Sequence, residues 1–429
     1  MEGIIISLAL LVFLAHLFSA LFTKTGLPDV LPMMLLGIVI GPVFRLVDPA
    51  DFGMVDKVFT QVLLIVILFE SGLGIRISHI RSTWTQSSRL TVISFIITAA
   101  SVTALAMIAL AMPLAYALIL GIILADNSFA VIIPLISKLN ISNNTRTVLL
   151  VECTMGSVLV IVGAISMLQM AKMQTFAPSV LIANIIYSLC GSFLAGTIAA
   201  VFWTTILSKI RKLENSIFLT LAFVLVVYSV CEALGADGAI GAFIFGVIAG
   251  NIRVIRHLNG FKFIETFTLN AKSKAFNGGE KNFFNEIVFI LRAFFFVYIG
   301  ICMHINSMYS MLCGLLFTMV IFMTRIPIAN FVLDKSISRI DTAVVSAMVP
   351  KGLVTAVLAS LVARSGISGA QVLQDTIYSV ILFSIIFATM ISFSIERGYG
   401  MPAINFLFKR HAVSGGQPQQ QHQPPAHGL

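Results

Sequence analysis

Long apolar runs, separated by short polar breaks, fill the chain from Gly3 almost to Phe406. A transmembrane helix needs roughly 20 mostly apolar residues, so the pattern predicts 13 membrane-spanning helices. The first run follows only Met1 and Glu2 and lacks the positive region of a signal peptide, so we expect it to be retained as a helix. The predicted spans are residues 3–22, 29–46, 57–74, 90–111, 114–137, 147–170, 180–206, 216–234, 237–252, 284–304, 308–332, 342–363 and 374–395.

The composition favours a membrane protein over a soluble one. Hydrophobic residues make up 58% of the 429 residues and charged residues only 10%, whereas a soluble domain carries about 25% charged residues. We therefore predict an all-α integral membrane protein with one transmembrane domain over residues 1–412. Residues 413–429 are rich in Gln, Pro, Gly and His and cannot form a core, so we expect a disordered cytoplasmic tail.

Basic residues are distributed unequally between the two sets of loops that the predicted spans create. Loops on one side carry 20 Lys and Arg residues, and loops on the other side carry 4. The positive-inside rule makes the richer side cytoplasmic, which puts the N-terminus outside and the C-terminus in the cytoplasm. The net charge of +9 is then a consequence of membrane topology, and we expect no nucleic-acid partner.

Two predicted spans contain helix-breaking residues beside polar or charged ones. Span 114–137 holds Ala-Asp-Asn-Ser at 125–128 followed by Pro134, and span 342–363 holds Val-Pro-Lys-Gly-Leu at 349–353. Broken helices of this kind form ion sites in secondary transporters, because freed backbone groups must be satisfied by protein or line a hydrated cavity. If the first six and last six spans are repeats, the broken spans are both fifth and run in opposite directions. This layout predicts an inverted 6+6 repeat with two interrupted helices that cross near the midplane.

Charged side chains inside the membrane are costly and therefore indicate function. Asp126 lies in the first break, and we expect its carboxyl group to bind either a proton or a metal cation, which is the basis of exchange. The alternative role for Asp126 is a helix cap or a structural hydrogen bond. Asn127, Ser128 and Ser157 are candidate ligands that offer neutral oxygens to a cation, with Asp126 and Ser157 the expected metal ligands. The alternative for each neutral residue is a hydrogen bond between helices.

Glu152 and Lys351 carry opposite charges on the two elements that are expected to meet. We predict that they form a structural ion pair that braces the crossing; the alternative is that Glu152 itself carries the proton. Gly156 lies on the same helical face as Glu152 and is expected to allow close backbone approach.

Three further charged residues lie near the ends of predicted spans, and we expect them to be structural or to line a vestibule. These are Glu70, Asp237 and Arg292, the last of which is a candidate partner for a carboxylate in the core.

The chain resembles the monovalent cation/proton antiporter superfamily, especially the prokaryotic sodium/proton antiporters with 13 helices. The resemblance covers about residues 5–395, and its segments occur in the order typical of these proteins. It rests on residues 26–28, 36–42, 68–73 (LFESGL), 238–243 (GAIGAF), 250–251, 294–300 and 350–354 (PKGLV).

The resemblance implies a homodimer in the plasma membrane of a bacterial or archaeal cell, with sodium or potassium ions and protons as substrates. It also implies that a mobile core moves like an elevator against a dimerisation scaffold. In this chain the core would comprise about residues 90–170 and 308–395, and the scaffold about residues 3–74 and 180–304.

This chain departs from the antiporter pattern at the ion site. Members of the superfamily usually carry Thr-Asp in the first broken helix and Asn-Asp in the next span. By spacing, the first pair falls on Asn127 and Ser128, and the second falls on Gly156 and Ser157. The main cation-binding Asp of the superfamily therefore appears as Ser157, and Asp126 lies two residues before its usual position.

Two hypotheses about function follow. The first is a secondary transporter that exchanges a monovalent cation for protons at a relocated carboxylate, Asp126 or Glu152. The second is a protein of the same fold without exchange, acting as a channel, a sensor or a carrier of another substrate. We expect no enzymatic activity and no cofactor, because no Ser-His, Cys-His or His-Glu-x-x-His arrangement is present.

Overall fold

The computed structural model describes residues 12–18, 20, 28–48, 53–74, 77–172, 178–210, 216–256, 278–303, 308–367 and 369–412. Most of the first predicted span and the whole predicted tail at 413–429 lie outside the described residues.

Helices make up nearly all of the regular structure in the described part of the chain. An apolar chain in lipid can satisfy its backbone polar groups within helices, which explains this all-α architecture. The predicted fold class, an all-α membrane protein, is confirmed. The helices in the order of the chain are α2 (Val30–Ile38), η1 (Val39–Val43), α3 (Gly53–Gly74), α4 (Ile77–Ala109), α5 (Leu114–Ile123), α6 (Phe129–Ser137), α7 (Asn143–Lys172), α8 (Pro178–Ile210), α9 (Ser216–Ala233), α10 (Gly238–Arg256), α12 (Gly278–Cys302), α13 (Met308–Val332), α14 (Arg339–Ala347), α15 (Leu353–Ala363), α16 (Ala370–Glu396) and α17 (Met401–Leu407).

Length and composition identify helices that can cross a membrane. Six described helices contain apolar segments long enough to span it alone, and six shorter apolar segments accompany them within the described residues. Among these shorter segments are α5 and α15, which each flank one of the two predicted breaks. The helices on the other side of the breaks, α6 and α14, are shorter still. The number of 13 spans stays a prediction.

The two predicted interruptions are confirmed. The fifth span divides into α5, which ends at Ile123, and α6, which begins at Phe129. The twelfth divides into α14, which ends at Ala347, and α15, which begins at Leu353. The second interruption coincides with Pro350 and Gly352. The first coincides with the polar residues 126–128, whereas Pro134 lies inside α6 and does not interrupt it.

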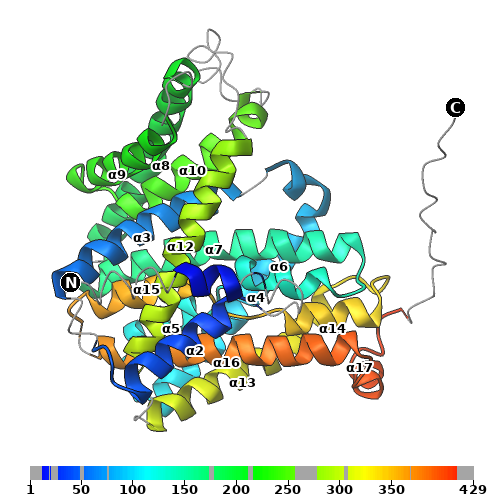
Figure 1. Ribbon diagram of the computed structural model, residues 1–429. Helices are drawn as coiled ribbons and strands as arrows, with labels where there is room; N and C mark the ends of the chain where they lie inside the picture. The colour runs from blue at the N-terminus through cyan, green and yellow to red at the C-terminus, as the bar shows by residue number, and fades with distance from the viewer. Residues whose placement is uncertain are drawn as a thin grey trace, which may run out of the picture.

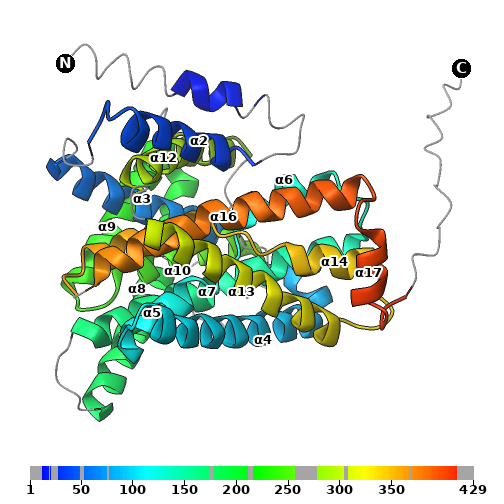
Figure 2. The ribbon, with the colours of Figure 1, turned by 90° about the horizontal axis from the view of Figure 1, so that it is seen from below.

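The helices pack in two groups that meet along the middle of the molecule (Figures 1 and 2). In one group, α4 packs against α5, α7 and α13, and α16 packs against α13 and α15. In the other group, α10 packs against α3, α8 and α9, and α12 packs against α2. The groups touch where α15 meets α3, where α16 meets α2, where α10 meets α4 and where α7 meets α8. Both interrupted helices belong to the first group.

Small residues allow the helices of the second group to approach closely. At Gly72 in α3, an added Cβ would collide with the backbone of Phe243 in α10, and at Gly246 in α10 it would collide with Phe69. Glycine on both sides therefore lets the backbones of α3 and α10 come into contact, as small residues do between membrane helices. This contact positions Glu70, which lies between Phe69 and Gly72, at the junction of the two groups.

Candidate functional site

The two breaks lie against each other and form a crossing. The backbone N–H of Ser128 donates to the carbonyl oxygen of Pro350 at 2.8 Å, which joins one extended segment to the other. The Gly352 backbone lies against the Ser128 side chain, and an added Cβ would collide with it. The backbone N–H of Lys351 donates to Ser384 Oγ of α16 at 3.0 Å. Glycine at 352 is therefore required for the breaks to approach this closely.

Asp126 is buried at the crossing, with 1% of its surface exposed. Its Oδ1 accepts a hydrogen bond from Ser157 Oγ of α7 at 2.7 Å, and its Oδ2 accepts one from Thr355 Oγ1 of α15 at 3.2 Å. Among the described residues, no Lys, Arg or His nitrogen lies within 4.0 Å of this carboxylate. The partners of the Asp126 carboxylate are therefore hydroxyl groups from two different helices.

Lys351 is equally buried but contacts neutral oxygens. Its Nζ donates to the carbonyl oxygen of Asp126 at 2.7 Å and to Asn127 Oδ1 at 3.1 Å. The carbonyl oxygen of Asp126 lies in the break and lacks a helical partner, so the ammonium group from the second break satisfies it. Lys351 thus occupies Asn127 Oδ1, which is one of the oxygens predicted to bind a cation.

The predicted ion pair between Glu152 and Lys351 does not form. Glu152 Oε2 instead pairs with Arg325 of α13 at 2.6 Å, and both side chains are at most 2% exposed. The Arg325 guanidinium also donates to the carbonyl oxygen of Val345 at 3.2 Å and to Ser94 Oγ. Because arginine carries several donors in a fixed plane, it can hold α4, α7 and the end of α14 together. The Lys351 ammonium group does not reach Glu152, because it donates to oxygens of Asp126 and Asn127 in the first break.

Asn127 links the crossing to this ion pair. Its Nδ2 donates to Glu152 Oε1 at 3.4 Å while its Oδ1 accepts from Lys351. Both ends of the amide are therefore hydrogen-bonded, one to α7 and one to the second break, which matches the alternative role of a structural hydrogen bond.

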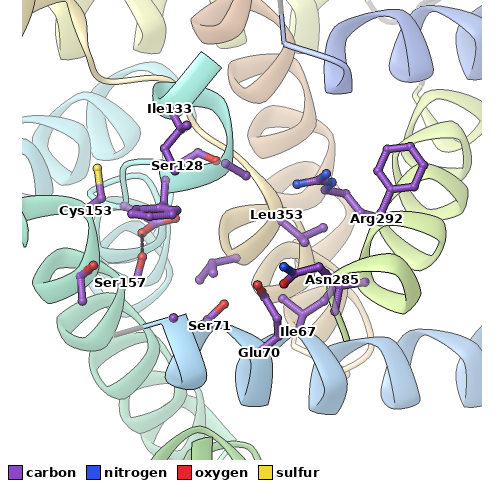
Figure 3. A pocket seen from close by; sticks show the side chains of 18 of the residues that line it. Ile67, Glu70, Ser71, Ser128, Ile133, Cys153, Ser157, Asn285, Arg292 and Leu353 are labelled. Carbon is purple, nitrogen blue, oxygen red and sulfur yellow. Dashed lines mark hydrogen bonds between the residues drawn. The ribbon is translucent and has the colours of Figure 1, made fainter. Parts of the chain in front are cut away.

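A cavity of about 330 Å³ lies beside the crossing, between the two groups of helices. The first group contributes Asp126, Ser128 and Ser157 to its wall, and the second group contributes Glu70 and Arg292. Figure 3 shows Ser128 and Ser157 on one side of this space and Glu70, Asn285 and Arg292 on the other. Asn127, Glu152 and Lys351 do not line it.

Of the three remaining predicted charged residues, two line the cavity and one does not. Glu70 and Arg292 both line the cavity, and Arg292 forms an ion pair with Asp29 before α2 at 3.3 Å. Asp237 lies away from the cavity at the start of α10, where its Oδ1 accepts from the backbone N–H of Ile240 at 2.9 Å. Asp237 is therefore a helix N-cap, for which Asp is a preferred residue.

Gly156 does not have the expected role. An added Cβ there would meet no atom of the described residues within 4 Å, so no backbone in this part of the chain approaches it. The close approach in this region occurs instead at Gly352, one residue after Lys351.

Thr355 and Arg325 also take part in the site, although neither is among the predicted site residues. Arg325 has a visible signal, because it is a full positive charge inside an apolar run, where such residues usually have an internal partner. Thr355 has almost none, because threonine is common in membrane helices and its position one turn after the second break becomes informative only once the two breaks are known to cross.

The hydroxyl partners make the Asp126 site suited to two loaded states. A hydroxyl group can donate to an ionised carboxylate, accept from a protonated one, or offer its oxygen to a cation. No group of three or more His, Cys, Asp or Glu side chains that could hold a metal ion occurs among the described residues. Any cation at Asp126 would therefore be bound by a single carboxylate with neutral oxygens, as a transported substrate.

Comparisons with known proteins identify the fold and the family of the chain. No curated protein matches the chain. The structure is similar to that of the sodium proton antiporter MjNhaP1 from Methanocaldococcus jannaschii at pH 8, with a TM-score of 0.72, 22% identity, and coverage of 92% of this chain and 100% of that chain. It is also similar to an electron-microscopy structure of the same antiporter, with a TM-score of 0.67, 20% identity, and coverage of 96% and 100%.

At this level of identity, the structural similarity establishes the fold. The family described as "Sodium/hydrogen exchanger, transmembrane" matches residues 9–395, which is nearly the whole chain and includes both breaks, Glu152, Ser157 and Arg325. This family consists of membrane transporters, and the chain belongs to it.

Proposed function

We propose that this protein exchanges one class of substrate, monovalent cations, for protons at the carboxylate of Asp126. The observation that carries the proposal is the contrast between the two buried acids at the crossing. Glu152 is neutralised by Arg325 at 2.6 Å. Asp126 instead faces the cavity, and its carboxylate accepts hydrogen bonds from the hydroxyl groups of Ser157 and Thr355, while Lys351 binds its backbone carbonyl and not its carboxylate. Asp126 is thus the acid that can gain or lose a proton without breaking an ion pair.

The size of the charge at Asp126 supports a monovalent substrate. Ca²⁺ takes about six to eight oxygen ligands, commonly with more than one carboxylate. The candidate ligands at the crossing are one carboxylate and the neutral oxygens of Ser157 and Thr355. A singly charged ion such as sodium, potassium or lithium matches this set, since it replaces one proton with no change in charge.

The position of the cavity supports an alternating-access mechanism of the elevator type. Asp126, Ser157 and Leu353 belong to the predicted mobile core, whereas Glu70 and Arg292 belong to the predicted scaffold. If the core slides along the scaffold as one body, Asp126 moves away from this cavity and toward the opposite side of the membrane. A homodimer would hold the scaffold still during this movement.

The predicted topology assigns this cavity to the cytoplasmic side. Its wall includes the end of α3 and the first half of α12, which adjoin the basic loops. We propose a plasma-membrane protein with the N-terminus outside and the C-terminus in the cytoplasm. Accessibility of single cysteines introduced at Asn144 and Gln371 to a membrane-impermeant reagent would test this, because only Gln371 is expected to react from outside the cell.

The central experiment measures proton flux in proteoliposomes. A pH-sensitive dye is trapped inside vesicles with an imposed proton gradient, and sodium, potassium or lithium is added over about pH 5–9, which covers the range in which a buried carboxyl group can titrate. Cation-dependent proton flux is expected for the unmodified protein and should be lost in Asp126→Asn. Asp237→Asn is the matched control, because Asn is also a good N-cap and the residue lies outside the cavity.

The double variant Glu152→Gln/Arg325→Met tests the alternative proton carrier. It removes both charges of the buried pair, so exchange should persist if Asp126 alone is shared by the cation and the proton. Flux that survives in Asp126→Asn but disappears in the double variant would transfer the role to Glu152. No flux with any cation in the unmodified protein would favour the second hypothesis, a protein of this fold without exchange.

A further inference from the structure

The short helix α17 closes one end of the first group of helices. Its buried residue Ile404, together with Phe408 just after the helix, packs against Ala343 of α14, with Ile326 of α13 and Ile395 of α16 beside them. Figures 1 and 2 both show α17 at the end of the bundle beside α14. One face of α17 is therefore covered by the ends of three helices, and the opposite face is free.

Three cation–aromatic pairs surround the free face of α17, each close enough for a cation–π interaction. The distances from the charged group to the ring centre are 4.3 Å, 4.6 Å and 5.4 Å for the pairs Arg397–Phe393, Lys409–Phe406 and Arg410–Phe331, which we call the α17 patch. All six residues are exposed, and the three rings leave between 49% and 68% of their surface uncovered. The patch is therefore an outward surface in which apolar rings and positive charges lie in contact.

The cations of the α17 patch have no internal counter-ion. In the described part of the chain, no carboxylate oxygen lies within 4.0 Å of a charged nitrogen of Arg397, Lys409 or Arg410. Residues 331–339 and 393–412, which hold the patch, contain five Lys and Arg residues against two Asp and Glu residues. This excess of positive charge is complementary to an anionic partner.

The exposed rings indicate which kind of anion fits. An aromatic ring is stabilised when it leaves water for an apolar phase, while a basic side chain beside it keeps its charged end among polar groups. Both conditions hold at the boundary of a bilayer, where acyl chains meet phosphate groups. Tyr399, which is 61% exposed between α16 and α17, is also a residue type enriched at this boundary. A soluble acidic partner would meet the cations but would leave the three rings in water.

We propose that the α17 patch binds the headgroups of anionic phospholipids, with its rings among the adjoining acyl chains. Each basic residue near an anionic membrane surface strengthens binding about fivefold, so three together contribute up to about 100-fold. The unequal distribution of basic residues assigns this end of the bundle to the cytoplasmic leaflet. Lipid bound there would hold the ends of α13, α14 and α16 at the membrane surface. The patch is separate from Asp126, so this assignment does not rest on cation exchange.

The test is photochemical labelling of the full chain in vesicles of phosphatidylcholine. Two probes are compared at the same small mole fraction, a phosphatidylglycerol and a phosphatidylcholine that carry the same photoreactive acyl chain. Mass spectrometry measures the amount of each probe attached to peptides covering residues 393–412. The anionic probe should label these peptides more strongly by about tenfold or more, and high salt should reduce this ratio by screening. Replacing chloride with inorganic phosphate at equal ionic strength should leave the ratio unchanged.

Two double variants complete the test. Lys409→Gln/Arg410→Gln removes two of the three cations, so the labelling ratio should fall to about fivefold or less. Arg89→Gln/Lys138→Gln is the matched control, because it removes two charges from the same predicted side of the membrane but outside the patch, and it should keep the ratio of the unmodified protein.

Equal labelling of the unmodified protein by the two probes would overturn the proposal. So would a ratio in Lys409→Gln/Arg410→Gln that equals that of the unmodified protein, or one that falls by the same amount in the control. Loss of the preference in phosphate but not in chloride would identify the patch as a site for a soluble anion and would also overturn the assignment to lipid.

Discussion

Removing one charge from the buried pair of Glu152 and Arg325 should destabilise the protein strongly, whereas removing both should not. The two side chains are at most 2% exposed, and their charged atoms lie 2.6 Å apart. Water cannot replace a lost partner at such a site, so one uncompensated charge costs about 3–5 kcal/mol in the free energy of unfolding. Replacement of a whole buried pair by uncharged groups of similar volume is often close to neutral.

The contacts of the pair rank the variants. In Glu152→Gln, Arg325 keeps Val345 and Ser94 as acceptors, so we expect a loss of about 3 kcal/mol, at the lower end of that range. In Arg325→Met, Glu152 keeps only the amide of Asn127 at 3.4 Å, and we expect about 5 kcal/mol. The double variant Glu152→Gln/Arg325→Met should lose less than either single variant, about 1–2 kcal/mol.

The assay is denaturant-induced unfolding in detergent micelles, with all four proteins in one double-mutant cycle. The losses of the single variants sum to about 8 kcal/mol against about 1–2 kcal/mol for the double variant, so the interaction energy between the two sites should be favourable by about 6–7 kcal/mol. If the losses of the two single variants simply add in the double variant, Glu152 and Arg325 are not coupled. The account of how α7 and α13 are joined behind the ion site would then be wrong.

Three further predictions concern the crossing and its surroundings. Gly352→Ala should place a methyl group against the Ser128 side chain, cost about 1–3 kcal/mol in the free energy of unfolding and strongly reduce transport. Gly156→Ala, whose methyl group meets no atom of the described residues within 4 Å, should leave stability and transport unchanged. Thermal unfolding and vesicle flux measure the two effects. Ser157→Ala should raise the KM for the cation by about tenfold. Thr355→Val should raise it by less, because the Thr355 hydrogen bond to Asp126 is 3.2 Å long and that of Ser157 is 2.7 Å. Equal KM values in both variants and the unmodified protein would exclude both hydroxyl groups as ligands. Asp237→Ala should lose the N-cap of α10 and about 1 kcal/mol of stability with no change in KM, and a raised KM would instead place this residue on the cation path.

The interruption of the two helices could be predicted from the sequence because its causes are local. Polar and charged residues in mid-span disfavour a continuous membrane helix, and at the second break proline and glycine add to this effect. The positions of the breaks therefore agree with the sequence to within about two residues, the usual uncertainty of helix ends. The all-α class could be predicted for the same reason, since apolar runs in lipid leave the backbone few other structures.

The partner of Glu152 could not be predicted in this way, because it depends on which helices are neighbours. Lys351 and Arg325 are both cations within apolar runs, and the sequence alone does not state which one faces Glu152. The structure answers this through geometry: Lys351 lies in an extended segment where unpaired carbonyl and amide oxygens take its donors, and Arg325 on α13 faces α7. Long-range packing, not local pattern, decides such pairs.

The role of Gly156 shows the same limit. Glycine in a membrane helix often marks close packing, but whether another backbone lies opposite depends on the helix rotation. Here the space beside Gly156 is open, and the close contact falls on Gly352.

Proton release on cation binding tests the central claim most directly. In weakly buffered detergent solution, a cation that displaces a proton from its ligand lowers the pH, and a pH indicator measures the amount. If the cation and the proton share the carboxylate of Asp126, the unmodified protein and Asp237→Asn should release protons when sodium, potassium or lithium is added. The Asp126→Asn variant, folded as judged by size-exclusion chromatography, should release none. Release from Asp126→Asn equal to that of the unmodified protein would contradict the assignment of exchange to this residue.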